Sequence, residues 1–277
     1  MDASILNQNP STLVSHSLSD RLFQSSTKAW FVVVVIGQLI FAYYIVRLYG
    51  VSGIQGNFER WNVQTTHGYL STDLIGNVIF GAHIAFAAII TLGGPIQLLP
   101  KIRVIAPRFH RINGRIYIGS AFLISIAGLY LAWAREAAGG LTGSVFISIN
   151  GLIILICAFY TIRFAVQRKL STHQQWAIRL FLAISGVWFF RVFLMLWLVI
   201  HQAPVGFDPE TFTGPFLNFL YVFVYILPQI FAEIYFRAKA STNARFKFSM
   251  ALFLVVMTMG ISVGIFAATL GMWLPVL

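Results

Sequence analysis

The chain has 277 residues, of which 58% are hydrophobic and only 10% are charged. A soluble domain carries about 25% charged residues, so this composition excludes a protein whose whole surface faces water. Nucleic acid is not an expected partner. The 19 Lys and Arg outnumber the 8 Asp and Glu, but they lie in short segments between apolar runs, as topology signals of membrane proteins do. Cys157 is the only cysteine, which excludes an intrachain disulfide.

Long apolar runs follow a polar N-terminal segment, residues 1–27, which we expect to be a flexible cytoplasmic tail. A transmembrane helix needs about 20 mostly apolar residues. The runs also lack the alternation of barrel strands and are about twice too long for them. Within residues 28–277 the expected spans are 29–48, 78–99, 115–134, 145–165, 176–200, 215–236 and 248–272. The sequence therefore predicts an all-α, polytopic transmembrane helical bundle of about seven spans.

Basic residues set the expected orientation, because Lys and Arg concentrate in cytoplasmic loops. Here they gather between spans two and three, four and five, and six and seven. This pattern places the N-terminus in the cytoplasm and the C-terminus outside, in a multi-pass protein of the inner cell membrane. Gly260 and Gly264 form a GxxxG pair in the seventh span. Such pairs let helices pack closely, so we expect this span to contact a neighbouring helix or to form a homo- or hetero-oligomer.

Two histidines mark the cytoplasmic face. Pro107 is a suitable first-turn residue for the third span, and Ser171 or Thr172 is a suitable N-cap for the fifth. His110 and His173 therefore fall in first turns at similar depth. Helix N-termini carry partial positive charge, and nearby arginines add to it. The predicted site for a small anionic or lipid-like ligand comprises His110, Arg111, Arg115, His173 and Arg179, with Gln97 and Glu233 at the same level.

The basic residues also have a less specific explanation. Topology selection alone places Lys and Arg at cytoplasmic helix ends, where they attract anionic lipid. Glu233 lies so close to the hydrocarbon that it should be paired, and Arg179 or Arg237 could neutralise it.

Two ionisable residues lie deeper in the expected spans, His83 in the second and Arg191 in the fifth. An intramembrane charge is costly unless it faces the bundle interior or water. The two positions lie within about one helical turn of each other in depth, so the pair could line one polar cavity that opens outward. The alternative is structural: an Arg bonded to helix carbonyls and a His bonded to a neighbouring hydroxyl.

The same residues form a recognisable pattern. It runs His83…Gly94-Pro95-x-Gln97…Arg103…Pro107-x-x-His110-Arg111-x-x-Gly114-Arg115-x-Tyr117, then His173-x-x-Trp176-x-x-Arg179, then Arg191. Over about residues 75–200 the chain resembles the bacterial membrane proteins catalogued as domain of unknown function 2306. One position departs from the pattern: Ala177 follows Trp176, where Met is expected. The resemblance implies a membrane fold and marks these residues, and it names no reaction.

Three functions fit the sequence. The first is a membrane protein that binds an anionic or lipid-like ligand at the His/Arg cluster. The second is a redox protein in which His110 and His173 ligate b-type haem or face a quinone, with Arg111, Arg115 and Arg179 holding the haem propionates. The third is an assembly factor without a ligand that acts through its seventh span.

Overall fold

The structure is a computed structural model that describes residues 17–65, 67–135 and 139–277, and these residues are almost entirely helical. The helices are α1 (Leu18–Ile45), α2 (Val51–Ile54), α3 (Leu74–Leu98), α4 (Pro100–Ile105), α5 (Pro107–Ala134), α6 (Gly140–Val166), α7 (Leu170–Ile184), α8 (Gly186–His201), α9 (Pro215–Tyr221), α10 (Leu227–Ala240) and α11 (Ala244–Ala268). π-Helical turns at Val46–Gly50, Val222–Ile226 and Thr269–Trp273 continue α1, α9 and α11. Short 3-10 helices occupy Phe58–Asn62 and Leu274–Val276.

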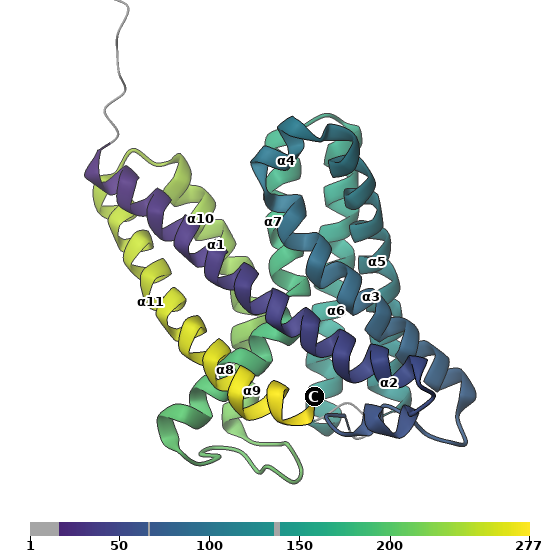
Figure 1. The fold of residues 1–277 in the computed structure, drawn as a ribbon. Helices are drawn as coiled ribbons and strands as arrows, with labels where there is room; N and C mark the ends of the chain where they lie inside the picture. The colour runs from purple at the N-terminus through teal and green to yellow at the C-terminus, as the bar shows by residue number, and fades with distance from the viewer. Residues whose placement is uncertain (1–16, 66, 136–138) are drawn as a thin grey trace, which may run out of the picture.

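The predicted membrane fold is confirmed. Six continuous helical stretches are long and apolar enough to cross a membrane, namely Leu18–Ile54, Leu74–Leu98, Pro107–Ala134, Gly140–Val166, Pro215–Ala240 and Ala244–Val276. The pair α7 and α8, which bends by 52°, makes a seventh if it is counted as one span. The termini of the described chain lie at opposite ends of the bundle (Figure 1).

The first helix begins earlier than the sequence predicts. Residues 18–27, assigned to the flexible tail, form the first turns of α1, and residues 1–16 lie outside the described chain. Ser17 caps this helix by accepting a hydrogen bond from the Asp20 backbone N–H at 3.2 Å. Phe23 is buried against Met250 and Leu254 of α11. Residues 18–27 are polar on one side only, and their apolar side packs against α11. The helix therefore begins before the apolar run that was predicted to span the membrane.

The fifth predicted span, 176–200, is broken at Ser185 into α7 and α8. Ser185 Oγ donates to the Phe181 carbonyl at 2.7 Å and accepts from Gln38 Nε2 of α1 at 2.7 Å. A serine bonded back to the preceding turn bends a helix. Gly186 lets the Tyr225 ring approach, because a Cβ there would lie 2.7 Å from it. A Ser-Gly pair inside an apolar run is too weak a signal to predict such a break.

The helices form two groups that diverge toward one end (Figure 1). We call α1, α10 and α11 the terminal limb and α3 to α7 the central limb. The α3–α5 connection, the α6–α7 loop and the α10–α11 loop lie at the diverging end, which we call the basic end (Figure 1). Its basic residues include Lys101, Arg103, Arg108, Arg168, Lys169 and Arg245.

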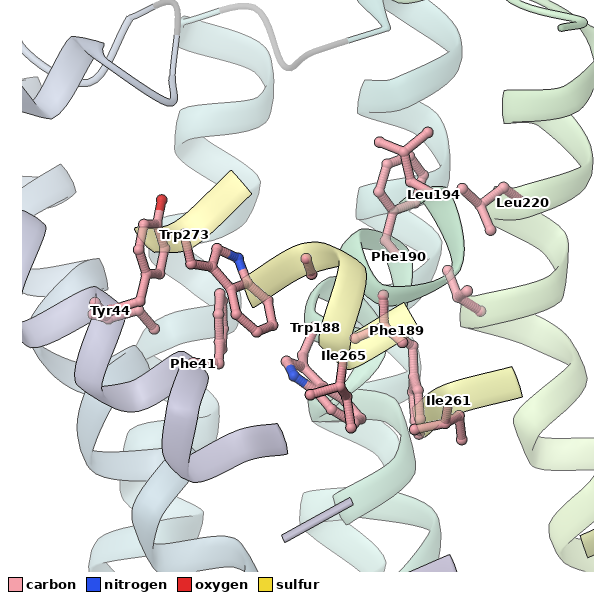
Figure 2. Close-up of a cluster of buried hydrophobic side chains, with 14 of the residues drawn as sticks. Phe41, Tyr44, Trp188, Phe189, Phe190, Leu194, Leu220, Ile261, Ile265 and Trp273 are labelled. Carbon is pink, nitrogen blue, oxygen red and sulfur yellow. The ribbon is translucent and has the colours of Figure 1, made fainter. Parts of the chain in front are cut away.

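At the opposite end the limbs converge on a core built around α8. Figure 2 shows Phe41 and Tyr44 of α1, Trp188 and Phe189 of α8, and Trp273 after α11 packed in one cluster. Gly264 of the predicted GxxxG pair contacts the backbone of Val192, because a Cβ at this glycine would overlap the Val192 carbonyl. The pair therefore packs α11 onto α8 of the same chain, and oligomerisation remains a prediction that would need another face.

A buried arginine organises the loop between α2 and α3 at this end. Arg135, whose side chain is 3% exposed, forms an ion pair with Asp73 at 2.9 Å. Its guanidinium also donates to Asn77 Oδ1 at 2.8 Å and to the carbonyls of His67, Gly68 and Asp73. His67 Nδ1 donates in return to the Arg135 carbonyl at 2.9 Å. The arginine is thus fully hydrogen-bonded, as a buried charge must be, and joins the loop to the end of α5.

This ion pair predicts a pH dependence of stability. The backbone N–H of Gly76 and the Arg135 guanidinium hold the pKa of Asp73 below its ordinary value of 3.8. A lowered carboxyl pKa stabilises the fold above the unfolded-state pKa, and this stabilisation is lost as pH falls through the folded-state pKa. We therefore expect Asp73→Asn to melt at a lower temperature than wild type at pH 6, and the difference to shrink at pH 3. A difference that is equal at both pH values would contradict this role.

Candidate functional site

A cleft of about 1690 Å³ separates the two limbs. It reaches the basic end, because residues at the ends of helices line it, including Asp20 of α1, Lys239 of α10 and Leu170 of α7. It extends inward as far as Phe189 of α8 and Ile261 of α11. The cleft is larger than the roughly 300–1,000 Å³ of ordinary small-molecule pockets. It therefore has room for a molecule with a long apolar part.

The polarity of the lining changes with depth. Apolar side chains line the inner part, among them Phe122, Phe189, Phe193, Met257 and Ile261. Basic side chains gather toward the basic end: Lys28, Arg103, Arg111, Arg115, Lys239 and Lys247. Of these, Lys247 forms an ion pair with Asp20, while the other five have no acidic partner in the described part of the chain. The cleft thus combines an apolar interior with unneutralised positive charge at its mouth.

Five of the predicted site residues line this cleft, namely Gln97, His110, Arg111, Arg115 and His173. They come from α3, α5 and α7 of the central limb. The structure therefore brings the predicted histidine pair and two of its arginines together in one cavity.

A chain of side-chain amides fixes the ring of His110. Asn113 Nδ2 donates to the Gly93 carbonyl at 3.0 Å and to Gln97 Oε1 at 2.9 Å. This orients the Gln97 amide so that its Nε2 faces His110 Nε2 at 3.3 Å. An amide nitrogen is a donor only, so His110 Nε2 accepts and the ring proton lies on Nδ1. That Nδ1–H is buried and has no hydrogen-bond partner among the described residues.

Tyr117 presents a second unpartnered group two turns further along α5. Its side chain lines the cleft and the residue is 4% exposed, and its hydroxyl has no hydrogen-bond partner among the described residues. The hydroxyl lies against Gly94 of α3, where a Cβ would be 3.2 Å from it. Sequence reasoning named Tyr117 only as part of a motif and did not single out Asn113. The spacing of Asn113 and Tyr117 from His110, three and seven residues, could have indicated their shared helix face.

His173 differs from His110 in which nitrogen it leaves free. Its Nδ1 donates to the Thr161 carbonyl of α6 at 2.9 Å, so Nε2 is the unprotonated nitrogen. A histidine fixed in this way is suited to ligate a metal. His110 is not, as arranged, because its unprotonated Nε2 accepts from Gln97. The pair therefore fits bis-histidine ligation of haem only if the Gln97 amide moves away.

Arg179 and Glu233 lie outside the cleft. They line a separate groove of about 610 Å³ between α6, α7 and α10. Arg179 forms an ion pair with Glu233 at 2.7 Å, and Glu233 also pairs with Arg237 at 2.9 Å. The expected neutralisation of Glu233 is thus found with both arginines. Because Arg179 belongs to α7 and Glu233 to α10, this pair connects the two limbs.

The structure does not bring His83 and Arg191 together. His83 of α3 packs against α5, where a Cβ at Gly128 would lie 3.2 Å from its ring. Arg191 of α8 donates to the Val187 carbonyl at 3.2 Å, with its guanidinium 5.6 Å from the centre of the Phe41 ring. Neither lines the cleft, and their neighbours come from different helices. The structural alternative, an arginine bonded to a helix carbonyl, describes Arg191.

The cleft-lining segments of α3, α5 and α7 fall within one segment that matches a family model. Residues 80–211 match the sequence model of the family described as "Predicted membrane protein (DUF2306)". The resemblance expected from the motifs is confirmed. No curated protein and no solved structure shows a significant match to the chain. The match supports a membrane protein and assigns no activity.

The amide chain predicts a defined tautomer. In solid-state NMR of protein carrying nitrogen-labelled histidine, we expect His110 to be neutral with its proton on Nδ1. Asn113→Leu removes the amide that orients Gln97, so we expect the tautomer preference of His110 to weaken. His173, which bonds to a backbone carbonyl, should keep its spectrum in the same variant. A wild-type His110 with its proton on Nε2 would contradict the assignment.

Proposed function

We propose that this membrane protein binds an amphiphilic molecule with an apolar body and an anionic head in the cleft between its limbs. The observation that carries the proposal is the change of lining along the cleft, from Phe, Met and Ile in the interior to unpaired Lys and Arg at the mouth. Apolar surface drives burial of the hydrocarbon part. The cations attract the head. Among the basic residues that line the cleft, only Lys247 forms an ion pair with an acidic residue of the described chain.

Membrane orientation is part of the same proposal. The positive-inside rule places the basic end in the cytoplasm, so the mouth of the cleft would face the inner surface of the cell membrane. That surface carries anionic lipid, whose attraction is about 1 kcal/mol for each nearby Lys or Arg. A nonspecific attraction of this kind acts on every basic residue of the basic end. A bound ligand acts only on those lining the cleft.

This difference supplies the test. We expect Arg111→Gln with Arg115→Gln to weaken binding of an anionic lipid, phosphatidylglycerol, by about tenfold or more, because two charge-assisted contacts are lost. The matched control is Arg163→Gln with Arg245→Gln, which removes the same charge from exposed residues of the same end that do not line the cleft. Native mass spectrometry of the detergent-purified protein titrated with this lipid measures both.

Equal losses in the two double variants would mean that general surface charge accounts for the binding. No saturable binding to the wild type would refute the proposal outright.

A redox role is the second candidate, and one observation favours it. His173 has its Nδ1 fixed by a carbonyl and its Nε2 free in the cleft, as expected for a metal-ligating histidine. If b-type haem binds, His173 would be one ligand and His110 the other after release from Gln97. We then expect protein purified from haem-replete cells to show a Soret band that is lost in His173→Ala. A colourless wild-type protein would eliminate haem.

A further inference from the structure

Both walls of the cleft carry positive charge. On the central limb the lining cations are Arg103 of α4 and Arg111 and Arg115 of α5. On the terminal limb they include Lys28 of α1 and Lys239 of α10. All five residues are exposed as well as lining the cavity. Their charges are therefore accessible to a molecule that occupies the cleft.

The three helices of the terminal limb pack together near its cations. Phe23 of α1 stacks on a tyrosine of α10 with ring centres 5.4 Å apart, and it is buried against α11. Lys247 of α11 forms an ion pair with Asp20 of α1, which neutralises both charges. Lys28 and Lys239 are thus the lining cations of this wall that have no acidic partner in the described part of the chain.

The charges of the two walls are not neutralised by an acidic group between them. Asp20 is the only acidic residue among the described residues that line the cleft, and Lys247 already pairs with it. The ion pair of Arg179 with Glu233, which connects the limbs, lies in the separate groove. Like charges placed opposite each other repel. Anionic groups bound between the walls would remove this repulsion.

The positive-inside rule explains only part of this arrangement. It concerns the number of Lys and Arg residues at the cytoplasmic side and does not require that they line one cavity from both limbs. Arg21 of α1 and Arg237 of α10 belong to the same helices as Lys28 and Lys239, yet they do not line the cleft. A ligand with one phosphate, held by the arginines of the central wall, would leave the two lysines uncompensated.

We propose that the head of the ligand carries two phosphate groups, one bound by each wall. The first lies among the central-wall arginines, because the guanidinium fork binds phosphate bidentately. The second lies between Lys28 and Lys239, whose flexible stems let each ammonium follow the phosphate as a point charge. This inference rests on the proposed function and names the class of head group. Two kinds of lipid share this chemistry: those whose phosphates are joined through glycerol, and lipid diphosphates, whose phosphates are joined directly.

The test compares lipids that differ by one phosphate. Phosphatidylglycerol is paired with phosphatidylglycerol phosphate, and phosphatidic acid with diacylglycerol diphosphate, all with identical acyl chains. Each is titrated into the full-length protein and measured by native mass spectrometry. In at least one pair, wild type should bind the lipid with two phosphates about fivefold more tightly or better, because the second phosphate gains charge-assisted contacts. The pair that shows the preference identifies how the two phosphates are joined.

Lys28→Gln with Lys239→Gln removes the two cations of the terminal wall. We expect the preference for two phosphates to fall below about twofold, because the second phosphate loses its contacts. The matched control is Lys101→Gln with Lys169→Gln, which removes the same charge from exposed lysines of the basic end that do not line the cleft. This control should keep the full preference. All four lysines are exposed, so both variants should fold, which their melting temperatures check.

The outcomes separate the two proposals. The two-phosphate assignment is wrong if wild type shows no preference in either pair, if the terminal-wall variant keeps the preference, or if both double variants lose it equally. In each of these cases binding of an amphiphile in the cleft stands. If none of the four lipids binds the wild type saturably, the proposed function itself is wrong.

Discussion

The packing of α8, which continues α7 of the central limb, against the terminal limb is the constraint on which the rest of the structure depends. Gly37 of α1 has no side chain, and a Cβ there would lie 2.6 Å from the Trp188 ring of α8. Gly264 of α11 allows the same closeness to Val192 from the other side. Close packing of this kind drives helix association within lipid. Because these contacts lie in one half of the bundle, the limbs can diverge in the other half and enclose a cleft.

The walls of that cleft show how a few polar side chains act in an apolar setting. Asn113 and Gln97 satisfy each other and one backbone carbonyl, and in doing so they set the proton of His110. Inside a low-dielectric region a hydrogen bond is stronger and an unpaired donor is more costly. The paired amides of Asn113 and Gln97 therefore fix the position of the histidine ring beside the cleft.

Much of the fold could be predicted from sequence, because span length and loop charge are properties of single segments. The site was predicted in part: His110 and His173 share a cavity because the first turns of α5 and α7 lie at the same end of the bundle and both line the cleft. Arg179 was assigned to the same site, but it faces α10 and pairs with Glu233. The direction of a side chain around a helix depends on which helices become neighbours, and single-sequence patterns do not contain this. The burial of Arg135 could not be predicted for the same reason, because the residues that surround it, His67, Gly68 and Asp73, are distant from it in sequence.

The core around α8 also determines which way a bound molecule can travel. The aromatic cluster formed by Phe41, Trp188 and Trp273 (Figure 2) lies in the converging half of the bundle, and none of these three residues lines the cleft. On α1 and α11 the residues that line the cleft end at Val32 and Ile261, before this cluster, so the opening of the cleft lies on the basic side. A hydrophobic chain lodged there would enter and leave through the same opening or sideways into the bilayer. Such a geometry suits holding or presenting a molecule within one leaflet and does not provide a passage across the membrane.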